Sequence, residues 1–367
     1  MFRTPRPNHA GMVQRSPALA GAAALALACA LSPPALADSQ FNLYGDIDAG
    51  LTTTGTRAGT ADGFSAATLD LFTTTTVDRW QFLAEVLFEA GDENAFNLDV
   101  ERIEVGYLFR NWLRVRVGRF HTAIGYYNDA FHHGAYFMLP VGRPTAVEFE
   151  DGGGLIPAHT VGLHADGRLP AGDGHLRYDL ELANGRGAEP DAIQNEHDTN
   201  RPKAFNVRLR YEPGGTLDGL VVGGNLYFDS IPAFAGPTPH GALHEWIVGA
   251  HAAYFEHEIH AVAEAMMIQH SELGTDAHHR TYAVFAEVGH SLDKLTPYAR
   301  YQWTQFPDEG DAFYARTADD GYQAVSLGVK HATSDNIALK AEAGVTFSQA
   351  PGADPLFSVT GQVAFAF

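Results

Sequence analysis

Apolar and polar side chains alternate along the segment LFSVTGQVAFAF, residues 356–367. Apolar residues or glycine occupy the odd positions from Phe357 to Phe367, and polar or small residues occupy the even positions. A period of two is the repeat of a β-strand, whose successive side chains point to opposite faces. The segment therefore predicts a strand with one apolar face and one wet face, and it ends on an aromatic residue.

The same alternation recurs in fifteen earlier segments. In one of them Trp80, Phe82 and Phe88 share a face, and Gln81 and Glu85 share the other. Each segment is close to the ten or so residues that a tilted strand needs to cross a bilayer. The predicted strands are Gln40–Leu51, Phe64–Val77, Trp80–Ala90, Leu98–Phe109, Leu113–Phe120, His159–Arg168, Leu176–Leu182, Phe205–Tyr211, Leu220–Asp229, Glu245–Glu256, Ile259–Gln269, Thr281–Leu292, Pro297–Gln305, Tyr322–Ala332, Ile337–Phe347 and Leu356–Phe367.

The connections between these segments alternate in length. Short ones such as Val77–Arg79 and Arg110–Asn111 lie between long polar ones such as Thr52–Gly63 and His121–Ala158. Short periplasmic turns and long outer loops are typical of outer-membrane barrels, and a soluble sandwich has no reason to alternate in this way. We therefore predict an all-β fold: a transmembrane antiparallel β-barrel of about sixteen strands. The terminal amphipathic strand ending in Phe367 resembles the terminal signal of such barrels.

The first 37 residues are predicted to be a secretory signal peptide. Basic residues precede a short apolar run, Ala18–Leu31, and Ala35-Leu36-Ala37 forms a small-x-small cleavage site. The run is too short for a membrane-spanning helix, and because no Arg-Arg pair is present the Sec route is expected. We predict cleavage after Ala37 and a barrel domain over residues 38–367.

Composition excludes several classes of protein. The chain has 44 acidic and 24 basic residues, a net charge of −20, which argues against a nucleic-acid partner. Its single cysteine, Cys29, lies in the predicted leader, so neither a disulfide framework nor a thiolate metal site is expected in the mature chain. No apolar run reaches the roughly 20 residues of a transmembrane helix, so a closed barrel is the expected way into a membrane.

The longest connection, His121–Ala158, follows the fifth strand and is unusually apolar for an outer loop. Phe131, Tyr136, Met138 and Leu139 favour burial. A barrel of about sixteen strands is too wide for side chains to fill and leaves an aqueous channel. We predict that this third loop folds into the lumen and forms a constriction; the alternative is a lid that packs on neighbouring outer loops.

The segments ERIEVGYLFRNWLRVRV (101–117) and GRFHTAIGYYNDAF (118–131) resemble the strand–turn–strand signature of the phosphate-selective porin O and P family. NGRG at 184–187 and PYARYQW at 297–303 resemble further family segments. The resemblance implies a sixteen-stranded, trimeric diffusion channel whose third loop lies in the pore. In that family phosphate selectivity depends on arginines and lysines in the constriction, and lysine is scarce in this chain.

Charged residues on the inward faces and in the third loop are the candidate site. Glu104 is expected beside Arg116 as a wall salt bridge, because cross-strand pairs of opposite charge are common in sheets. A basic strip opposite acidic loop residues would give a transverse field, which leaves anion and weak cation preference open. The residues expected to line the pore or its constriction are Arg102, Glu104, Arg114, Arg116, Arg119, Arg208 and Arg210 on the strands and Asp129, Glu148, Glu150 and Asp151 in the loop.

Histidines suggest an alternative role in divalent-metal transport. His132-His133 and His278-His279 are adjacent pairs in predicted loops, and His251 and His260 are expected to face the lumen. A competent metal site needs three or four converging ligands. We therefore interpret these histidines as polar residues of the loops and the lumen, and we expect no metal and no cofactor.

An outer-membrane hydrolase is a rival class. No G-x-S-x-G motif occurs, and Ser271 beside His270 is adjacency in sequence rather than the geometry of a triad, so we expect no enzyme. An adhesin remains open. The sequence predicts a bacterial outer-membrane porin for passive diffusion of small hydrophilic solutes or ions, including anions such as phosphate. Its expected partners are outer-membrane lipid, lipopolysaccharide and two further copies of the chain.

Overall fold

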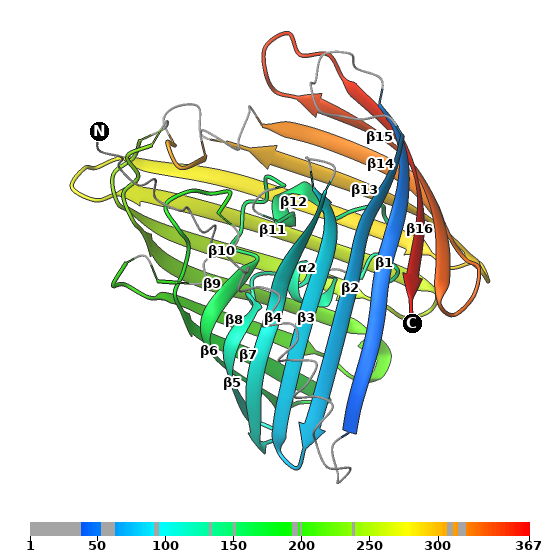
Figure 1. The fold of residues 1–367 in the computed structure, drawn as a ribbon, viewed down its shortest axis with the longest axis horizontal. Helices are drawn as coiled ribbons and strands as arrows, with labels where there is room; N and C mark the ends of the chain where they lie inside the picture. The colour runs from blue at the N-terminus through cyan, green and yellow to red at the C-terminus, as the bar shows by residue number, and fades with distance from the viewer. Residues whose placement is uncertain are drawn as a thin grey trace, which may run out of the picture. The chain divides into compact units, whose positions relative to one another are not determined.

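Sixteen antiparallel strands form a closed barrel in a computed structural model (Figure 1). The structure describes residues 38–52, 63–91, 95–131, 134–149, 152–192, 197–198, 200–236, 239–306, 311–314 and 321–367. The strands are β1 (Asp38–Thr52), β2 (Gly63–Val77), β3 (Trp80–Gly91), β4 (Ala95–Arg110), β5 (Leu113–His121), β6 (His159–Ala171), β7 (Gly174–Ala183), β8 (Ala204–Glu212), β9 (Leu220–Ile231), β10 (Leu243–Tyr254), β11 (Ile259–Glu272), β12 (His278–His290), β13 (Leu295–Gln305), β14 (Tyr322–Ala332), β15 (Ile337–Ser348) and β16 (Leu356–Ala366). Every predicted segment is a strand, which confirms the predicted fold class.

The alternating segment at 356–367 closes the barrel. β16 pairs with β15 on one side and with β1 on the other, where Ile47 lies opposite Val363. The amide of Phe367 also donates to the carbonyl of Leu43 at 2.8 Å. Because each remaining strand pairs with its two neighbours in sequence, the sheet has no free edge strand. Closure satisfies the wall's backbone groups, as a lipid environment requires.

The wall sorts its side chains as the alternation predicts. Large apolar residues face outward: Phe41 is 72% exposed and Leu327 is 61% exposed. Charged residues face inward and are buried, among them Glu245 and Arg208, each 0% exposed. This arrangement is the reverse of that in a water-soluble protein and matches a barrel with a lipid-facing surface. No helix in the described ranges is long and apolar enough to span a membrane.

Connections alternate between short turns and longer segments. Two residues separate β2 from β3, β4 from β5 and β6 from β7. The turn between β2 and β3 places Asp78 at a φ of 55°, a left-handed conformation that aspartate tolerates better than most residues. The predicted alternation is thus present at the turns that the structure describes. The predicted leader, residues 1–37, lies outside the described residues, so its cleavage after Ala37 stays a prediction.

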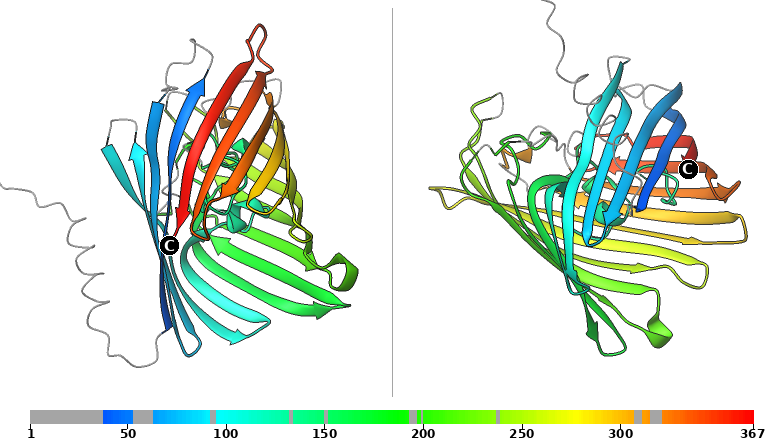
Figure 2. Two further views of the ribbon diagram at one scale, coloured as in Figure 1. Left: turned by 90° about the vertical axis from the view of Figure 1, so that its right-hand side faces the viewer. Right: turned by 60° about the horizontal axis from the view of Figure 1, so that its bottom comes forward.

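The connection between β5 and β6, here called loop 3, lies inside the barrel (Figures 1 and 2). It contains a single helical turn, α2 (Tyr127–Ala130), and a 3-10 turn, η1 (Thr145–Val147). Tyr127, Val147 and Ile156 are buried in one cluster with Ile247 and Phe285 of the wall. The prediction that this loop enters the lumen is confirmed, and its apolar residues have their partners on the inner face of β9–β12.

Candidate functional site

The base of loop 3 is attached to the wall through its backbone amides. The amide of Ala123 donates to Glu181 at 2.8 Å, and those of Tyr126 and Tyr127 donate to one oxygen of Glu264 at 2.9 and 2.5 Å. Buried amides need such partners, because an unpaired one carries the full cost of its lost hydration. Inward carboxylates of β7 and β11 therefore hold the first turn of loop 3 against the wall.

Gly125 lies close against the wall. Its φ is +70°, and a Cβ built there would lie 2.1 Å from a carboxylate oxygen of Glu264. The amide of Gly125 donates to Asn225 Oδ1 at 3.0 Å, and its carbonyl accepts from Arg208 at 2.9 Å. Only glycine combines this conformation with this approach.

Two buried arginines organise the middle of loop 3. Arg143 donates to the carbonyl of Val147 at 2.8 Å, to the carbonyl of Phe131 at 3.1 Å and to Asn128 Oδ1 at 2.9 Å. Arg300 of β13 donates to the Tyr127 hydroxyl and the Gly142 carbonyl, each at 3.1 Å. Arg300 also pairs with Glu287 at 2.8 Å. Arg143 thus joins the two arms of loop 3, and Arg300 joins both arms to the wall.

The far arm of loop 3 reaches β14 and β15. Lys340 donates to the carbonyls of Ala135 and Pro140 at 2.5 and 3.0 Å, and Lys330 donates to the carbonyl of Tyr136. The ring of Phe137, 48% exposed, meets Tyr44 of β1 edge-on at 5.7 Å. Loop 3 therefore extends from the inner face of β6 to the opposite side of the barrel.

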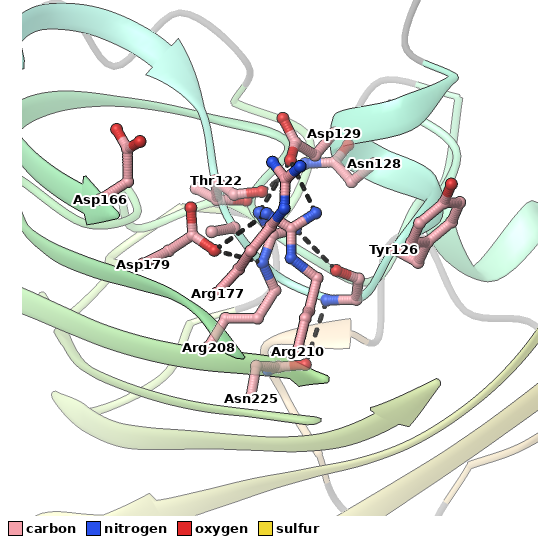
Figure 3. Close-up of polar contacts among 12 residues, drawn as sticks. Thr122, Tyr126, Asn128, Asp129, Asp166, Arg177, Asp179, Arg208, Arg210 and Asn225 are labelled. Atoms are coloured by element: carbon pink, nitrogen blue, oxygen red, sulfur yellow. Dashed lines mark hydrogen bonds and ion pairs between the residues drawn. The ribbon is translucent and has the colours of Figure 1, made fainter. Parts of the chain in front are cut away.

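Loop 3 presents Asp129 to the basic wall formed by β8 (Figure 3). Arg208 pairs with Asp129 at 2.7 Å and with Asp179 of β7 at 2.9 Å. Arg210 pairs with Asp179 at 3.3 Å and with Asp129 at 3.8 Å. Partial burial raises the pKa of Asp129, whose side chain is 41% exposed, but the two guanidinium groups outweigh this effect and lower that pKa from 3.8 to about 2. Asp129 is therefore ionised at neutral pH and fixes this edge of loop 3.

The predicted wall pair between Glu104 and Arg116 is present. Arg116 Nη1 lies 2.8 Å from Glu104 Oε2, and Arg116 Nε lies 3.2 Å from Asp166. Arg114 donates twice to the same Asp166, each time at 3.1 Å. Glu104 is diagonal to Arg116 because Glu104 itself lies opposite Gly118.

Three of the remaining predicted site residues, Arg102, Arg119 and Glu148, have partners in the structure. Arg102 pairs with Glu85 at 2.5 Å and lies 5.0 Å from the centre of the Phe72 ring. The Arg119 side chain is buried and donates to the carbonyl of Glu101 at 3.1 Å. Glu148 lies 4.0 Å from Arg143 of the same loop. Glu150 and Asp151 lie outside the described residues. The pore-lining role assigned to all of these residues stays a prediction.

A cavity of about 160 Å³ adjoins this wall at the short-turn end. Arg114, Arg168, Arg177 and Arg210 are among its lining residues, with Asp166 and Asp179. Arg168 and Arg177 were not among the predicted site residues. The alternation in β7 does place Arg177 inward, but only the pairing of β6 with β7 brings Arg168 directly opposite it.

The family model for Gram-negative porins matches residues 22–350. The chain belongs to the Gram-negative porin family. It is thus a β-barrel channel of the bacterial outer membrane, and the family favours a channel over an enzyme.

Solved porin structures share the fold of this porin at low identity. An anion-selective porin from Comamonas acidovorans has 12% identity and a TM-score of 0.60, with 90% of this chain and 100% of that chain covered. OmpT of Vibrio cholerae and the outer-membrane channel DcaP of Acinetobacter baumannii each have 13% identity and a TM-score of 0.59. Each match covers 92% of this chain and 99% of the other chain. No curated protein matches the chain.

Three of the histidines considered for metal binding have separate partners. His260 lies 3.7 Å from Glu287, His278 lies 2.9 Å from the Ser271 hydroxyl, and His251 packs near Tyr126. His132 and His133 lie outside the described residues. Within the part of the chain that the structure describes, no group of three His, Cys, Asp or Glu residues is placed to hold a metal ion.

Proposed function

We propose that this porin conducts small hydrophilic solutes by passive diffusion and prefers anions. The observation that carries the proposal is the difference in exposure between arginines and glutamates on the wall of β3–β5; on β8 the order is reversed, since Arg208 is 0% exposed and its partner Asp129 in loop 3 is 41% exposed. The side chains of Arg102 and Arg114 are 20% and 33% exposed, whereas those of Glu85 and Glu104 are 3% exposed. The net charge of the whole chain is negative, but a solute in the lumen interacts with the charged side chains that are exposed to solvent.

The inward carboxylates of β7 accept hydrogen bonds from side chains of β8. Asp179 and Glu181 are buried, and both have hydrogen-bond donors on β8. Asp166 is more exposed, at 20%, but it pairs with the still more exposed Arg114. Fixed positive charge on a low-dielectric wall raises the local concentration of anions, which supports selectivity by electrostatic focusing.

Loop 3 is the proposed constriction. It covers the inner face of β8–β13 and leaves the basic wall of β4–β8 beside its Asp129 edge. The path would then run beside this edge and along the exposed side chains of Arg102 and Arg114. The resemblance of residues 101–131 to phosphate-selective porins supports phosphate among the permeant anions.

We further propose a homotrimer with outer-membrane lipid and lipopolysaccharide around it. One of the similar solved structures, OmpT of Vibrio cholerae, is described as a trimer. Cross-linking in mild detergent followed by sedimentation would test the subunit number.

A planar-bilayer recording in a KCl gradient tests anion preference. The reversal potential is expected to have the sign for chloride selectivity and to move toward zero in an R102Q/R114Q variant. The matched control is R79Q/R110Q, which removes two exposed arginines, one in the turn between β2 and β3 and one at the end of β4. A cation-selective reversal potential in the wild-type protein would refute the proposal.

A further inference from the structure

Six arginines of β5–β8 lie within 4 Å of a carboxylate, and they form two groups according to the carboxylates they share. The first group has four arginines and four carboxylates: Arg114, Arg116, Arg208 and Arg210 share Glu104, Asp129, Asp166 and Asp179. The second group has two arginines and one carboxylate, since Arg168 and Arg177 share Glu212. Among the described residues, the second group therefore carries one positive charge that no carboxylate matches.

The unmatched charge lies where a solute can reach it. The side chains of Arg168 and Arg177 are 47% and 43% exposed, the highest values of the six. Both residues line the 160 Å³ cavity at the short-turn end of the barrel. This end is periplasmic in outer-membrane barrels.

Strand register brings the positive charges together. Arg168 lies directly opposite Arg177, and Arg177 lies directly opposite Arg210 on β8. Like charges in directly opposed positions of a sheet are unfavourable, so the row gains from an added anion. Glu212 meets Arg177 Nε at 2.6 Å but Arg168 Nη2 only at 3.7 Å, and it leaves most of the two guanidinium edges without a carboxylate.

We propose that Arg168 and Arg177 form a saturable binding site for the carboxylate of a small organic acid at the periplasmic mouth. The proposal rests on the anion preference proposed above and adds a defined site to it. The planar guanidinium fork matches a carboxylate with two parallel hydrogen bonds, as Arg114 already shows with Asp166. One carboxylate would neutralise the single surplus positive charge. The cavity has room for the short carbon chain of a small organic acid.

The test is chloride conductance measured in oriented single channels while sodium acetate is added to one side. In the wild-type protein, conductance is expected to fall with saturation and at a lower acetate concentration from the periplasmic side than from the outer side. In R168Q/R177Q the half-inhibiting concentration is expected to rise about tenfold or more, since loss of a charge-assisted pair costs at least one factor of ten in affinity. R79Q/R110Q, which also removes two arginines at the short-turn end but leaves Arg168 and Arg177 in place, should match the wild-type protein.

Three results would overturn the site. One is equal inhibition of R168Q/R177Q and wild-type channels, and another is inhibition without saturation. The third is inhibition by phosphate but not by acetate, which would reject the carboxylate as the ligand group. Failure of the site is distinguishable from failure of anion preference, because the reversal potential in KCl alone measures the latter. A native-like heat-modifiable band in gel electrophoresis confirms that the variant channels are folded.

Discussion

Arg143 Nη2 donates a hydrogen bond to Asn128 Oδ1 at 2.9 Å and joins the outgoing and returning arms of loop 3. The Arg143 side chain is buried, and its other donors reach the carbonyls of Phe131 and Val147. None of these contacts involves the barrel wall. The shape of the loop and the stability of the barrel should therefore respond differently to substitution at this position.

Substitution of Arg143 is expected to widen and loosen the channel. R143M removes three hydrogen bonds, each worth about 1–3 kcal/mol for a charged donor, and leaves the acceptors unpaired. Single-channel conductance and current noise should rise in R143M, and R143K should restore part of the wild-type value. The thermal unfolding of the barrel should change little. R110M, at the exposed last residue of β4, is the matched control, and equal conductance in R143M and wild type would contradict the role.

Asp129 gives loop 3 a defined acid sensitivity. Its pKa is lowered from 3.8 to about 2 in the folded protein by Arg208 and Arg210, against the opposing effect of burial and of Asp179. A carboxyl with a depressed pKa contributes stability above its ordinary pKa and loses that contribution as the pH falls through the folded value. Current noise should thus stay constant from pH 7 to about 4 and increase from about pH 4 to 2. D129N should be noisy throughout, and an identical pH profile in D129N would count against this assignment.

Removal of a buried wall carboxylate should strengthen anion preference. In E104Q the partner Arg116 retains Asp166 at 3.2 Å but loses the pair at 2.8 Å. The reversal potential in a KCl gradient should move toward the chloride value, and the barrel should be destabilised by about 1–3 kcal/mol. E258Q, which neutralises an exposed turn residue, should leave both measurements unchanged. A shift toward the potassium value in E104Q would show that Arg116 does not act on permeant ions.

The alternation of side chains was sufficient to predict the wall of the barrel. The period of two determines which residues share a face of the sheet, and it correctly predicts that Glu104 lies beside Arg116. The positions of Glu264, Arg300 and Lys340 as partners of loop 3 were not predicted. Each lies more than a hundred residues from its loop contact, and an inward position on a strand does not specify which segment fills the lumen.

The solvent exposure of the inward charged side chains also could not be predicted from the sequence. Inward arginines and inward carboxylates occur on neighbouring strands, and their numbers alone leave ion preference undecided. Exposure depends on side-chain length and on the neighbouring strand: the side chains of Arg168 and Arg177 are 47% and 43% exposed, whereas that of Asp179 is 5% exposed.

Lys340 should control the position of the far arm of loop 3. Its ammonium group is buried and donates to the carbonyls of Ala135 and Pro140, so K340M removes both bonds and leaves two acceptors unpaired at a cost of about 1–3 kcal/mol. Because Phe137 lies on the same arm and contacts Tyr44 of β1, release of the arm should move this aromatic ring in the lumen. Open-channel current should then show additional levels in K340M and not in K294M, which alters an exposed turn. A single unchanged conductance level in K340M would mean that the remaining contacts of loop 3 suffice to hold the arm.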